Sequence, residues 1–364
     1  MAPVSRDPRT REYARLIVER SLDVQPGWQV LIRSTPLARP ALEEIVRLIA
    51  RRGAYPILRI GSGLLWPANA EWAAEAPEEL LGELPGIDRF AVEQMDARIT
   101  LDAPENARAG SGLAIEKQTL LRKAAQPFYR RSMSMEIPWV GCQFPCPALA
   151  QEAGMATAEF EDFLYAAVLR DWDEEARRME RLAARFSAAS EMRIVGAGTD
   201  LTVGLVGREA HVDEGKVNLP GGEFFFCPVE DSAEGEITFA EFPTERDGTI
   251  VEGIRLVFRE GVVVEASARR GEEALVDGLD TDDGSRRLGE VGIGCNEGIT
   301  RHLNNTLFDE KMAGTVHLAL GAGYAFAGGT NVSALHWDIV KDLRRDGRLS
   351  CDGELVQEDG RWLI

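Results

Sequence analysis

Residue types that bind transition metals gather in the last third of this chain, in short segments flanked by glycine. The segments are NLPGGE, RRLGEVGIG, GTVHLALG and SALHWD, and the residues in question are Glu223, Glu290, His317, His336 and Asp338. The chain has only four histidines, so finding two of them beside carboxylates is not expected from composition alone. Imidazole and carboxylate ligands suit Zn, Mn, Co or Fe(II), and they exclude a thiolate site. The sequence therefore predicts a metal site.

The spacing of His336 and Asp338 supports this prediction. In a β-strand, residues two apart project from the same face, so an imidazole and a carboxylate in His-x-Asp point into one space. The segment NVSALHWDIV is rich in β-branched and aromatic residues and follows a Gly-Gly-Thr turn, which favours a strand. On a helix the same two side chains would diverge.

His317 lies in an alternating segment, TVHLAL. Val316, Leu318 and Leu320 form one apolar set, and His317 falls in the other set. This period of two is typical of a strand, so we expect the imidazole to lie opposite the core-facing side chains.

Glu223 and Glu290 each follow a glycine, the residue that permits a sharp turn or a close backbone approach. With them the set has five members, more than the three protein ligands of a single catalytic zinc and about what two metals use when a carboxylate bridges them. We favour two metal ions, bridged by Glu290 or Glu223. The alternative is that some of the acids are solvated strand ends and the histidines are satisfied core residues.

Longer motifs around these residues resemble a known family. The runs NLPGGEFFFCPVEDSAEGEITF, RRLGEVGIGCNEGI, FDEKMAGTVHLALGAGY and GGTNVSALHWDIVKDLR are similar to the thermophilic metalloaminopeptidases, the family that contains aminopeptidases T and S. YARLIVERSLDVQPGWQVLI and PALAQEAGM extend a looser similarity into the N-terminal half. The resemblance implies that the five residues are metal ligands, that Tyr324 is catalytic, and that the protein is a homodimer acting on peptides with a free N-terminus.

The expected chemistry follows from this set. Two divalent metals would activate a shared water against a polarised carbonyl, and the α-amine of the substrate would ligate one of them. Tyr324 follows a Gly-Ala-Gly turn after His317, where its hydroxyl would donate to the oxyanion; the alternative is a packing tyrosine.

Two other functions stay open. The scaffold also resembles the mononuclear Fe(II) dihydroxypyridine ring-cleaving dioxygenases, in which His317, His336 and Asp338 would form a facial triad. That reading leaves Glu223 and Glu290 without a ligand role. The third possibility is a catalytically silent scaffold, against which stands the presence of all six positions.

The sequence also suggests roles for residues outside the ligand set. Glu310 either passes a proton to the leaving amine or pairs with Lys311 on a surface turn, and we favour the pair. His302 and His211 have no neighbouring ligand pattern, and we expect them to be polar surface or core residues. The run of Phe224 to Phe226 indicates only an apolar neighbourhood.

Composition bounds the possible partners. The net charge is −19, without a basic stripe, an aromatic nucleic-acid motif or a zinc finger, so nucleic acid is not expected as a partner. The N-terminus lacks the apolar core of a signal peptide, and no stretch reaches transmembrane length. We therefore expect a cytoplasmic protein that has no membrane as a partner. The five cysteines have no paired zinc spacing, and we interpret them as reduced structural thiols.

The N-terminal part has the pattern of an α/β fold. An amphipathic helix is expected over residues 13–22, a strand over 26–34, a second helix over 42–49 that ends at Gly53, and a strand over 55–60. Strand, helix and strand over about thirty residues form a βαβ unit, so the sheet is at least partly parallel. No phosphate-binding glycine motif accompanies this unit, so a nucleotide cofactor is not predicted.

The chain changes character near residue 185. Residues 148–189 are helical and charged, and after Glu191 short strands alternate with turns. We therefore predict an α/β domain over 1–185, with a helical linker, and a β-rich α+β metal-binding domain over 186–364. The tail reads as β-hairpins with Asp-Gly turns, and Trp337 and Trp362 as core aromatics.

Overall fold

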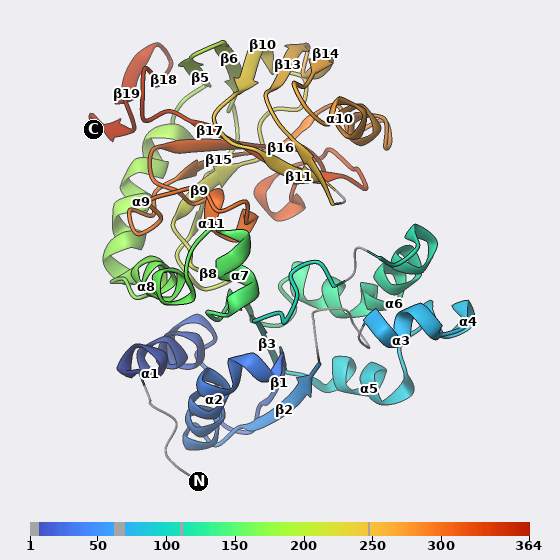
Figure 1. Ribbon diagram of the computed structural model, residues 1–364. Coiled ribbons are helices and arrows are strands. Elements are labelled where there is room, and N and C mark those ends of the chain that lie inside the picture. The colour runs from blue at the N-terminus through green and yellow to red at the C-terminus, as the bar shows by residue number, and fades with distance from the viewer. Residues whose placement is uncertain (1–6, 62–69, 110–111, 247) are drawn as a thin grey trace. The chain divides into compact units, whose positions relative to one another are not determined.

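A computed structural model describes residues 7–61, 70–109, 112–246 and 248–364. The chain forms two compact units, the first comprising residues 1–170 and 215–221, and the second comprising residues 171–214 and 222–364 (Figure 1). The first unit contains a parallel sheet and the second contains antiparallel sheets, which confirms the predicted fold class.

The first unit is built on a five-stranded parallel sheet in the order β2-β1-β3-β4-β8. Its strands are β1 (Gln29–Ser34), β2 (Tyr55–Ile60), β3 (Ala97–Asp102), β4 (Trp139–Gln143) and β8 (Asn218–Leu219). Its helices are α1 (Pro8–Arg15), α2 (Arg39–Arg51), α3 (Ala70–Glu75), α4 (Glu78–Leu81), α5 (Gly86–Gln94), α6 (Ile115–Met133), α7 (Pro147–Glu152) and α8 (Thr157–Val168), with a π-helical turn, η1 (Leu16–Ser21), and a 3₁₀ turn, η2 (Pro36–Ala38).

The predicted βαβ unit is confirmed. Strands β1 and β2 are parallel and α2 connects them. Gly53 follows α2 at φ +75°. This left-handed conformation commonly ends a helix, and glycine adopts it with the least strain because it has no Cβ. The first predicted helix begins earlier than expected, at Pro8, because Asp7 caps it by accepting a hydrogen bond from the Arg9 amide.

The second unit contains an eight-stranded antiparallel sheet in the order β14-β13-β10-β6-β5-β18-β19-β20, and a five-stranded antiparallel sheet in the order β17-β16-β15-β9-β7. The eight strands are β5 (Glu191–Gly196), β6 (Thr199–Gly204), β10 (Glu234–Phe239), β13 (Ile254–Arg259), β14 (Val262–Ser267), β18 (Arg348–Cys351), β19 (Glu354–Glu358) and β20 (Arg361–Trp362). The five strands are β7 (His211–Asp213), β9 (Glu223–Phe226), β15 (Leu288–Gly294), β16 (Thr315–Gly321) and β17 (His336–Asp342). The remaining elements are the hairpin of β11 (Thr244–Arg246) and β12 (Thr249–Val251), the helices α9 (Trp172–Ser187), α10 (Glu272–Leu279) and α11 (Thr306–Asp309), and the 3₁₀ turn η3 (Ala325–Ala327).

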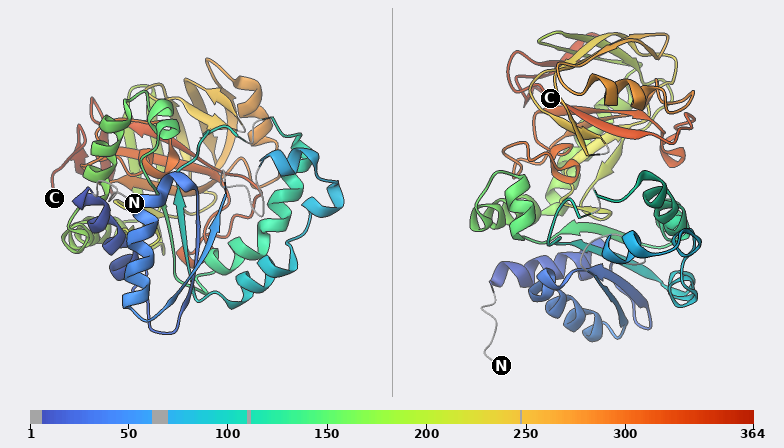
Figure 2. Two further views of the ribbon diagram at one scale, coloured as in Figure 1. Left: turned by 60° about the horizontal axis from the view of Figure 1, so that its bottom comes forward. Right: turned by 45° about the vertical axis from the view of Figure 1, so that its right-hand side comes forward.

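The core of the second unit lies between its two sheets, which appear as stacked layers in Figures 1 and 2. Alternate residues of both sheets enter it, such as Ile194 and Leu201 from one and Phe224 and Leu318 from the other. The opposite face of the five-stranded sheet is therefore free to carry polar side chains. Trp337 is buried in this core and Trp362 packs against it, as predicted.

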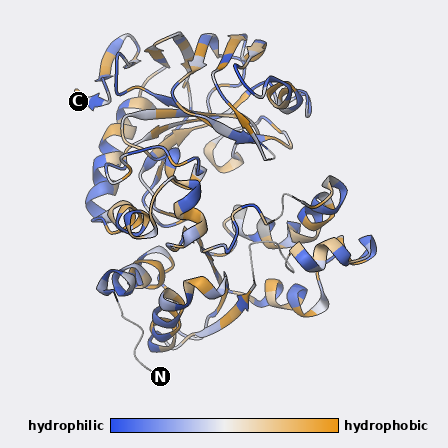
Figure 3. Ribbon diagram, in the orientation of Figure 1, coloured by the Kyte–Doolittle hydropathy of each residue, from blue (hydrophilic) through white to orange (hydrophobic). Residues whose placement is uncertain are grey.

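Helix α9 belongs to the second unit, so the units divide after Arg170 and not near residue 185. The helix is amphipathic, with hydrophilic and hydrophobic residues along its length (Figure 3). Met179, Leu182 and Phe186 form its buried face, and the ring of Phe186 lies 5.2 Å from that of Phe224. The sequence pattern showed the helix and its charged face, but not which sheet it covers.

The C-terminal tail forms β-hairpins with Asp-Gly turns, as predicted. Asp352-Gly353 joins β18 to β19, and Asp359-Gly360 joins β19 to β20. All four residues have positive φ, which two-residue hairpin turns of the mirror-image type require. The described helices include none with the length and apolar character needed to cross a bilayer.

Candidate metal centre

One face of the five-stranded sheet carries the candidate ligands. In an antiparallel ladder, residues directly opposite each other point to the same face, as do residues two apart along a strand. His317 on β16 lies opposite Gly292 on β15 and Val340 on β17. Glu290 is two residues from Gly292, and Asp338 is two residues from Val340. Both side chains therefore share the face of His317.

Strands β9 and β17 add the other two candidates by the same rule. Glu223 lies opposite Gly294, which is two residues from Gly292, and His336 lies two residues before Asp338. The predicted strand at His336 is thus confirmed. It carries the imidazole of His336 and the carboxylate of Asp338 on one face. Four adjacent strands position all five side chains.

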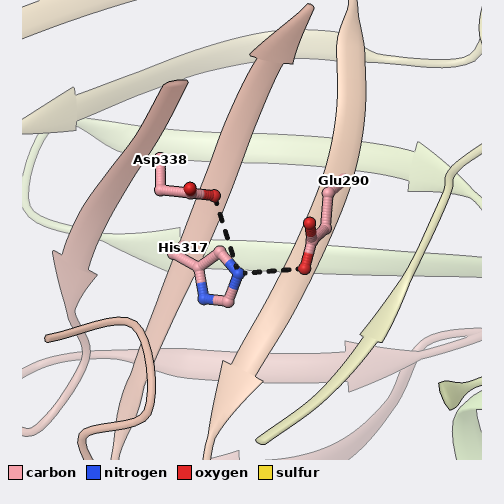
Figure 4. A group of neighbouring side chains, drawn as sticks. All are labelled: Glu290, His317 and Asp338. Atoms are coloured by element: carbon pink, nitrogen blue, oxygen red, sulfur yellow. Dashed lines mark hydrogen bonds and ion pairs between the residues drawn. The ribbon is translucent and has the colours of Figure 1, made fainter. Parts of the chain in front are cut away.

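Three of these side chains meet at one point (Figure 4). Nε2 of His317 lies 3.2 Å from Oε1 of Glu290 and 4.0 Å from Oδ1 of Asp338. One ligand atom from each of the three residues falls within 4.8 Å of the other two. This spacing is compatible with a single ion held between them.

His336 closes the group from the other side. Its Nε2 lies 3.5 Å from Oε2 of Glu290 and 3.6 Å from Oδ2 of Asp338. Each of the two carboxylates therefore presents one oxygen to His317 and the other to His336. A carboxylate with both oxygens engaged in this way has the arrangement that a bridging ligand needs.

Both imidazoles are oriented by backbone carbonyls. Nδ1 of His317 lies 3.1 Å from the carbonyl of Glu310, and Nδ1 of His336 lies 2.9 Å from the carbonyl of Ala322. A carbonyl only accepts, so each Nδ1 carries the proton and donates it. Nε2 of each ring then faces the carboxylates, and a metal ion bound there would replace the proton on this nitrogen, as in protein metal sites where a carbonyl fixes the ligand tautomer.

Glu223 lies apart from the other four. Its Oε2 is 3.7 Å from Nδ1 of His317, on the far side of that ring from Glu290, and its Oε1 is 3.1 Å from Nζ of Lys311. Among the residues that the structure describes, Oε2 of Glu223 and Oδ1 of Asp338 are buried oxygens without a hydrogen-bond partner. Buried carboxylate oxygens are costly unless something compensates them, and a cation would do so.

Lys311 is a member of the site that the sequence did not reveal. Its side chain is fully buried, it contacts the carboxylates of Glu223 and Glu310, and its Nζ lies 3.7 Å from Oδ2 of Asp213. The expected pair with Glu310 exists, but its placement on a surface turn was wrong. The attraction of the facing carboxylates outweighs the cost of burying the ammonium group. Lysine is usually found on the solvated surface, but this one is buried.

The charge distribution favours cations. Burial raises the pKa of Glu290, and it raises the pKa of Glu310 as well. Burial alone would lower the pKa values of His317 and His336, but the neighbouring carboxylates outweigh it and raise both. The site thus has an excess of negative charge, and both the charge and the ligand types fit divalent metal ions.

Tyr324 lies beside the ligands, just before η3. Its hydroxyl is 3.3 Å from Nε2 of His336, and its backbone N–H donates to Sγ of Cys227 at 3.2 Å. Burial raises the pKa of Tyr324, and the negative charge of Glu290 raises it further, so the phenol keeps its proton. The hydroxyl is therefore a donor next to the candidate metal ligands.

Gly292 makes room for His317. A Cβ at this position would lie 1.9 Å from Cε1 of the imidazole, closer than any two carbons can approach without a bond. The glycines before Glu290 and Glu223 serve packing instead. A Cβ at Gly289 would meet the Ala322 carbonyl at 2.1 Å, and one at Gly222 would meet the Cβ of Asn296 at 2.6 Å.

Gly292→Ala is expected to lower metal affinity at least tenfold without touching a ligand. The new methyl group must push the His317 ring off its position, and metal sites lose affinity when ligand orientation changes. Titration of the metal-free variant with Zn²⁺ or Co²⁺ measures the effect. Gly86→Ala is the control, because nothing lies within 4 Å of its Cβ. Wild-type affinity in the Gly292 variant would contradict this role.

The other histidines and the cysteines lie outside the ligand cluster. His302 stacks on Phe242 at 4.5 Å, and His211 stacks on Phe225 at 5.7 Å, in line with the non-ligand roles expected of them. All five cysteines are buried and free.

Comparison with known proteins assigns the chain to a family. Residues 6–362 match the family described as thermophilic metalloprotease (M29). Aminopeptidase T of Thermus thermophilus is 30% identical, with 97% of this chain and 98% of the relative covered, and aminopeptidase 2 of Geobacillus stearothermophilus is 28% identical, with 96% and 97% covered.

Solved structures give the same result. The structure of wild-type AmpT from Thermus thermophilus has a TM-score of 0.83 at 27% identity, covering 98% of this chain and 99% of the other. A 2,5-dihydroxypyridine dioxygenase from Pseudomonas putida has a TM-score of 0.64 at 14% identity, covering 100% and 99%, and so shares the fold alone. From its sequence match and its structure, the chain belongs to the M29 family of thermophilic metalloproteases and is a metallopeptidase.

Proposed function

We propose that this protein is an aminopeptidase that removes N-terminal residues from peptides with the help of two divalent metal ions, Zn, Co or Mn. The observation that carries the proposal is the convergence of Glu290, His317, His336 and Asp338 on one sheet face, with Glu223 behind His317 and the phenol of Tyr324 beside His336. Relatives that match over nearly the whole chain are named aminopeptidases.

The charge of the site supports two ions. The set joined by these contacts holds five carboxylates and one ammonium group, so it carries a charge of −4 when all the carboxylates are ionised and both imidazoles are neutral, the state in which these groups bind metal; its carboxylates are Asp213, Glu223, Glu290, Glu310 and Asp338. Two divalent cations neutralise that charge, whereas one leaves half of it. Burial of uncompensated charge is expensive, which favours the two-ion state.

The residues divide the work of hydrolysis. Glu290 and Asp338, which face both imidazoles, are the candidate bridging ligands, and Glu223 is the candidate ligand on the Nδ1 side of His317. Divalent ions held there would polarise the scissile carbonyl and lower the pKa of water. Tyr324 donates its phenol hydrogen to the oxyanion that forms at the carbonyl.

The dioxygenase alternative fits these contacts less well. A facial triad of His317, His336 and Asp338 has no use for Glu290, yet Glu290 lies within 3.5 Å of both imidazoles. The likeness to the dioxygenase structure, at 14% identity, concerns the fold. The homodimer and the cytoplasmic location expected from the sequence stay predictions.

Cleavage is expected only when the substrate has a free N-terminus. If the site holds the substrate amine, acetylation removes that interaction and lowers kcat/KM by at least 100-fold, because binding lost at the reacting end is lost in the transition state. The measurement compares leucine p-nitroanilide with its N-acetyl form, using the metal-loaded enzyme. Equal turnover of both would overturn the aminopeptidase proposal, and turnover of a dihydroxypyridine with neither anilide cleaved would favour the dioxygenase.

A further inference from the structure

Aromatic rings form a cluster at one end of the ligand set. The ring centre of Tyr324 lies 5.3 Å from that of Phe326, 5.6 Å from that of Phe225 and 5.2 Å from that of His336. His211 extends the cluster, 5.2 Å from Phe326 and 5.7 Å from Phe225. Tyr324 thus has its hydroxyl at a candidate ligand and its ring in an apolar surface.

The strand pattern places Phe225 outside the core. It lies two residues after Glu223 on β9 and shares its face of the sheet, whereas Phe224 and Phe226 point to the other face and are fully buried. The run of three phenylalanines therefore serves two purposes. Its outer members fill the core, and its middle member borders the metal centre.

Phe326 remains largely exposed in this cluster, with 55% of its surface accessible. A large apolar side chain that is exposed beside a hydrolytic site is a typical feature of a ligand-binding surface. The ring belongs to η3, in the connection between β16 and β17, which also carries Tyr324. Substrate recognition and catalysis would thus share one short segment.

The connection is held in place by polar contacts at several points. Nδ2 of Asn331 donates to the carbonyls of Gly321 and Gly284 at 2.6 and 2.8 Å. The carboxylate of Glu230 accepts from Thr330, and the carboxylate of Asp282 accepts from the hydroxyl of Ser333 at 2.7 Å. These bonds fix the segment without burying Phe326, so the ring is presented in a defined position.

We propose that Phe326 and Phe225 form the subsite that binds the side chain of the substrate's N-terminal residue, and that they select large apolar side chains. The inference rests on the proposed aminopeptidase function. In that reaction the attacked carbonyl belongs to the N-terminal residue, whose side chain begins two bonds away, whereas the side chain of the second residue begins three bonds away. With Tyr324 donating at the carbonyl, the side chain nearest to the ring cluster is that of the N-terminal residue.

The size of the expected effect follows from apolar recognition in general. One methylene group in a hydrophobic pocket changes kcat/KM by about 10- to 200-fold. Leucine has three more carbons than alanine, but an open surface covers it only in part. We therefore expect the wild-type enzyme to prefer leucine to alanine p-nitroanilide by at least 10-fold in kcat/KM, and Phe326→Ala to remove most of that preference.

The experiment measures this ratio in matched variants of the metal-loaded enzyme. Phe326→Leu keeps an apolar side chain and should hold the ratio within about threefold of wild type, whereas Phe326→Ala lowers it by about tenfold. Phe90→Ala is the control, because Phe90 is 64% exposed and belongs to α5 of the first unit. Metal content is determined for each sample, so that a change in selectivity is separated from loss of the ions.

The outcomes separate this inference from the function on which it rests. A wild-type enzyme that cleaves neither anilide overturns the proposed function, and the subsite with it. An active Phe326→Ala enzyme with the wild-type leucine-to-alanine ratio overturns the subsite alone. The subsite is also overturned by a third outcome. In it, Phe326→Ala alters selectivity only among dipeptides that keep leucine as the first residue and vary the second.

Discussion

Replacing Asp338 or His336 by alanine is expected to release at least one of the two proposed metal ions and to remove nearly all hydrolysis. Asp338 faces both imidazoles, and Nε2 of His336 contacts both shared carboxylates, so either change breaks several contacts at once. The far-UV circular dichroism should stay close to wild type, because the two side chains point away from the core. Metal analysis of the purified variants, beside a wild type holding two equivalents, measures the result.

The control for this prediction lies on the same strand. Asp342 is the last residue of β17 and pairs with Arg344 at 2.7 Å, outside the cluster. Asp342→Asn should therefore keep both ions and the wild-type kcat. Full metal occupancy in the Asp338 and His336 variants would show that these residues are not ligands, and one equivalent of iron in the wild type would favour the oxygenase.

Tyr324→Phe is expected to lower kcat by roughly 10²–10³, the usual cost of losing one oxyanion donor, while KM and metal content stay nearly unchanged. The substitution keeps the ring, and with it the contacts to Phe225 and Phe326. It removes only the hydroxyl, which lies 3.3 Å from His336. Steady-state kinetics and metal analysis on one sample separate the two effects.

A packing role for Tyr324 leads to a different result. Phenylalanine would preserve the volume, so activity would stay within a few-fold and the free energy of unfolding would change by about 1 kcal/mol for the lost hydroxyl contact. Wild-type kcat in this variant would end the catalytic assignment. A lowered leucine-to-alanine ratio with unchanged kcat would instead assign the hydroxyl to substrate selection.

The sequence was informative where the signal is local. The period of two placed His336 with Asp338 on one strand face, and the Asp-Gly pairs marked the C-terminal hairpins, because both depend on neighbours along the chain. The roles of Gly292 and Lys311 depend on contacts between distant segments. Gly292 matters because the register sets it opposite His317, and a register is decided by packing of whole strands.

Lys311 shows the same limit for charge. A lysine next to a glutamate usually indicates a solvated ion pair, and composition gives no reason to read it otherwise. Its burial becomes favourable only when strands β7 and β9 bring Asp213 and Glu223 to its ammonium group. The division of the units after Arg170 is similar, because the apolar face of α9 would fit either unit until the sheets exist.

The path of the chain between Asp213 and Glu223 limits how the gene for this protein can recombine. Residues 215–221 leave the second unit, place β8 at the edge of the parallel sheet beside β4, and return at Gly222, whose amide donates to the Asp213 carbonyl at 2.8 Å. Neither unit is therefore encoded by one uninterrupted stretch of gene. Recombination at residue 170 would give one descendant a parallel sheet without its last strand and the other an orphaned strand beside Glu223. Gene fusion and shuffling should thus preserve the two units as a pair, and exchange of either one alone would require one crossover on each side of β8 in addition to one after Arg170.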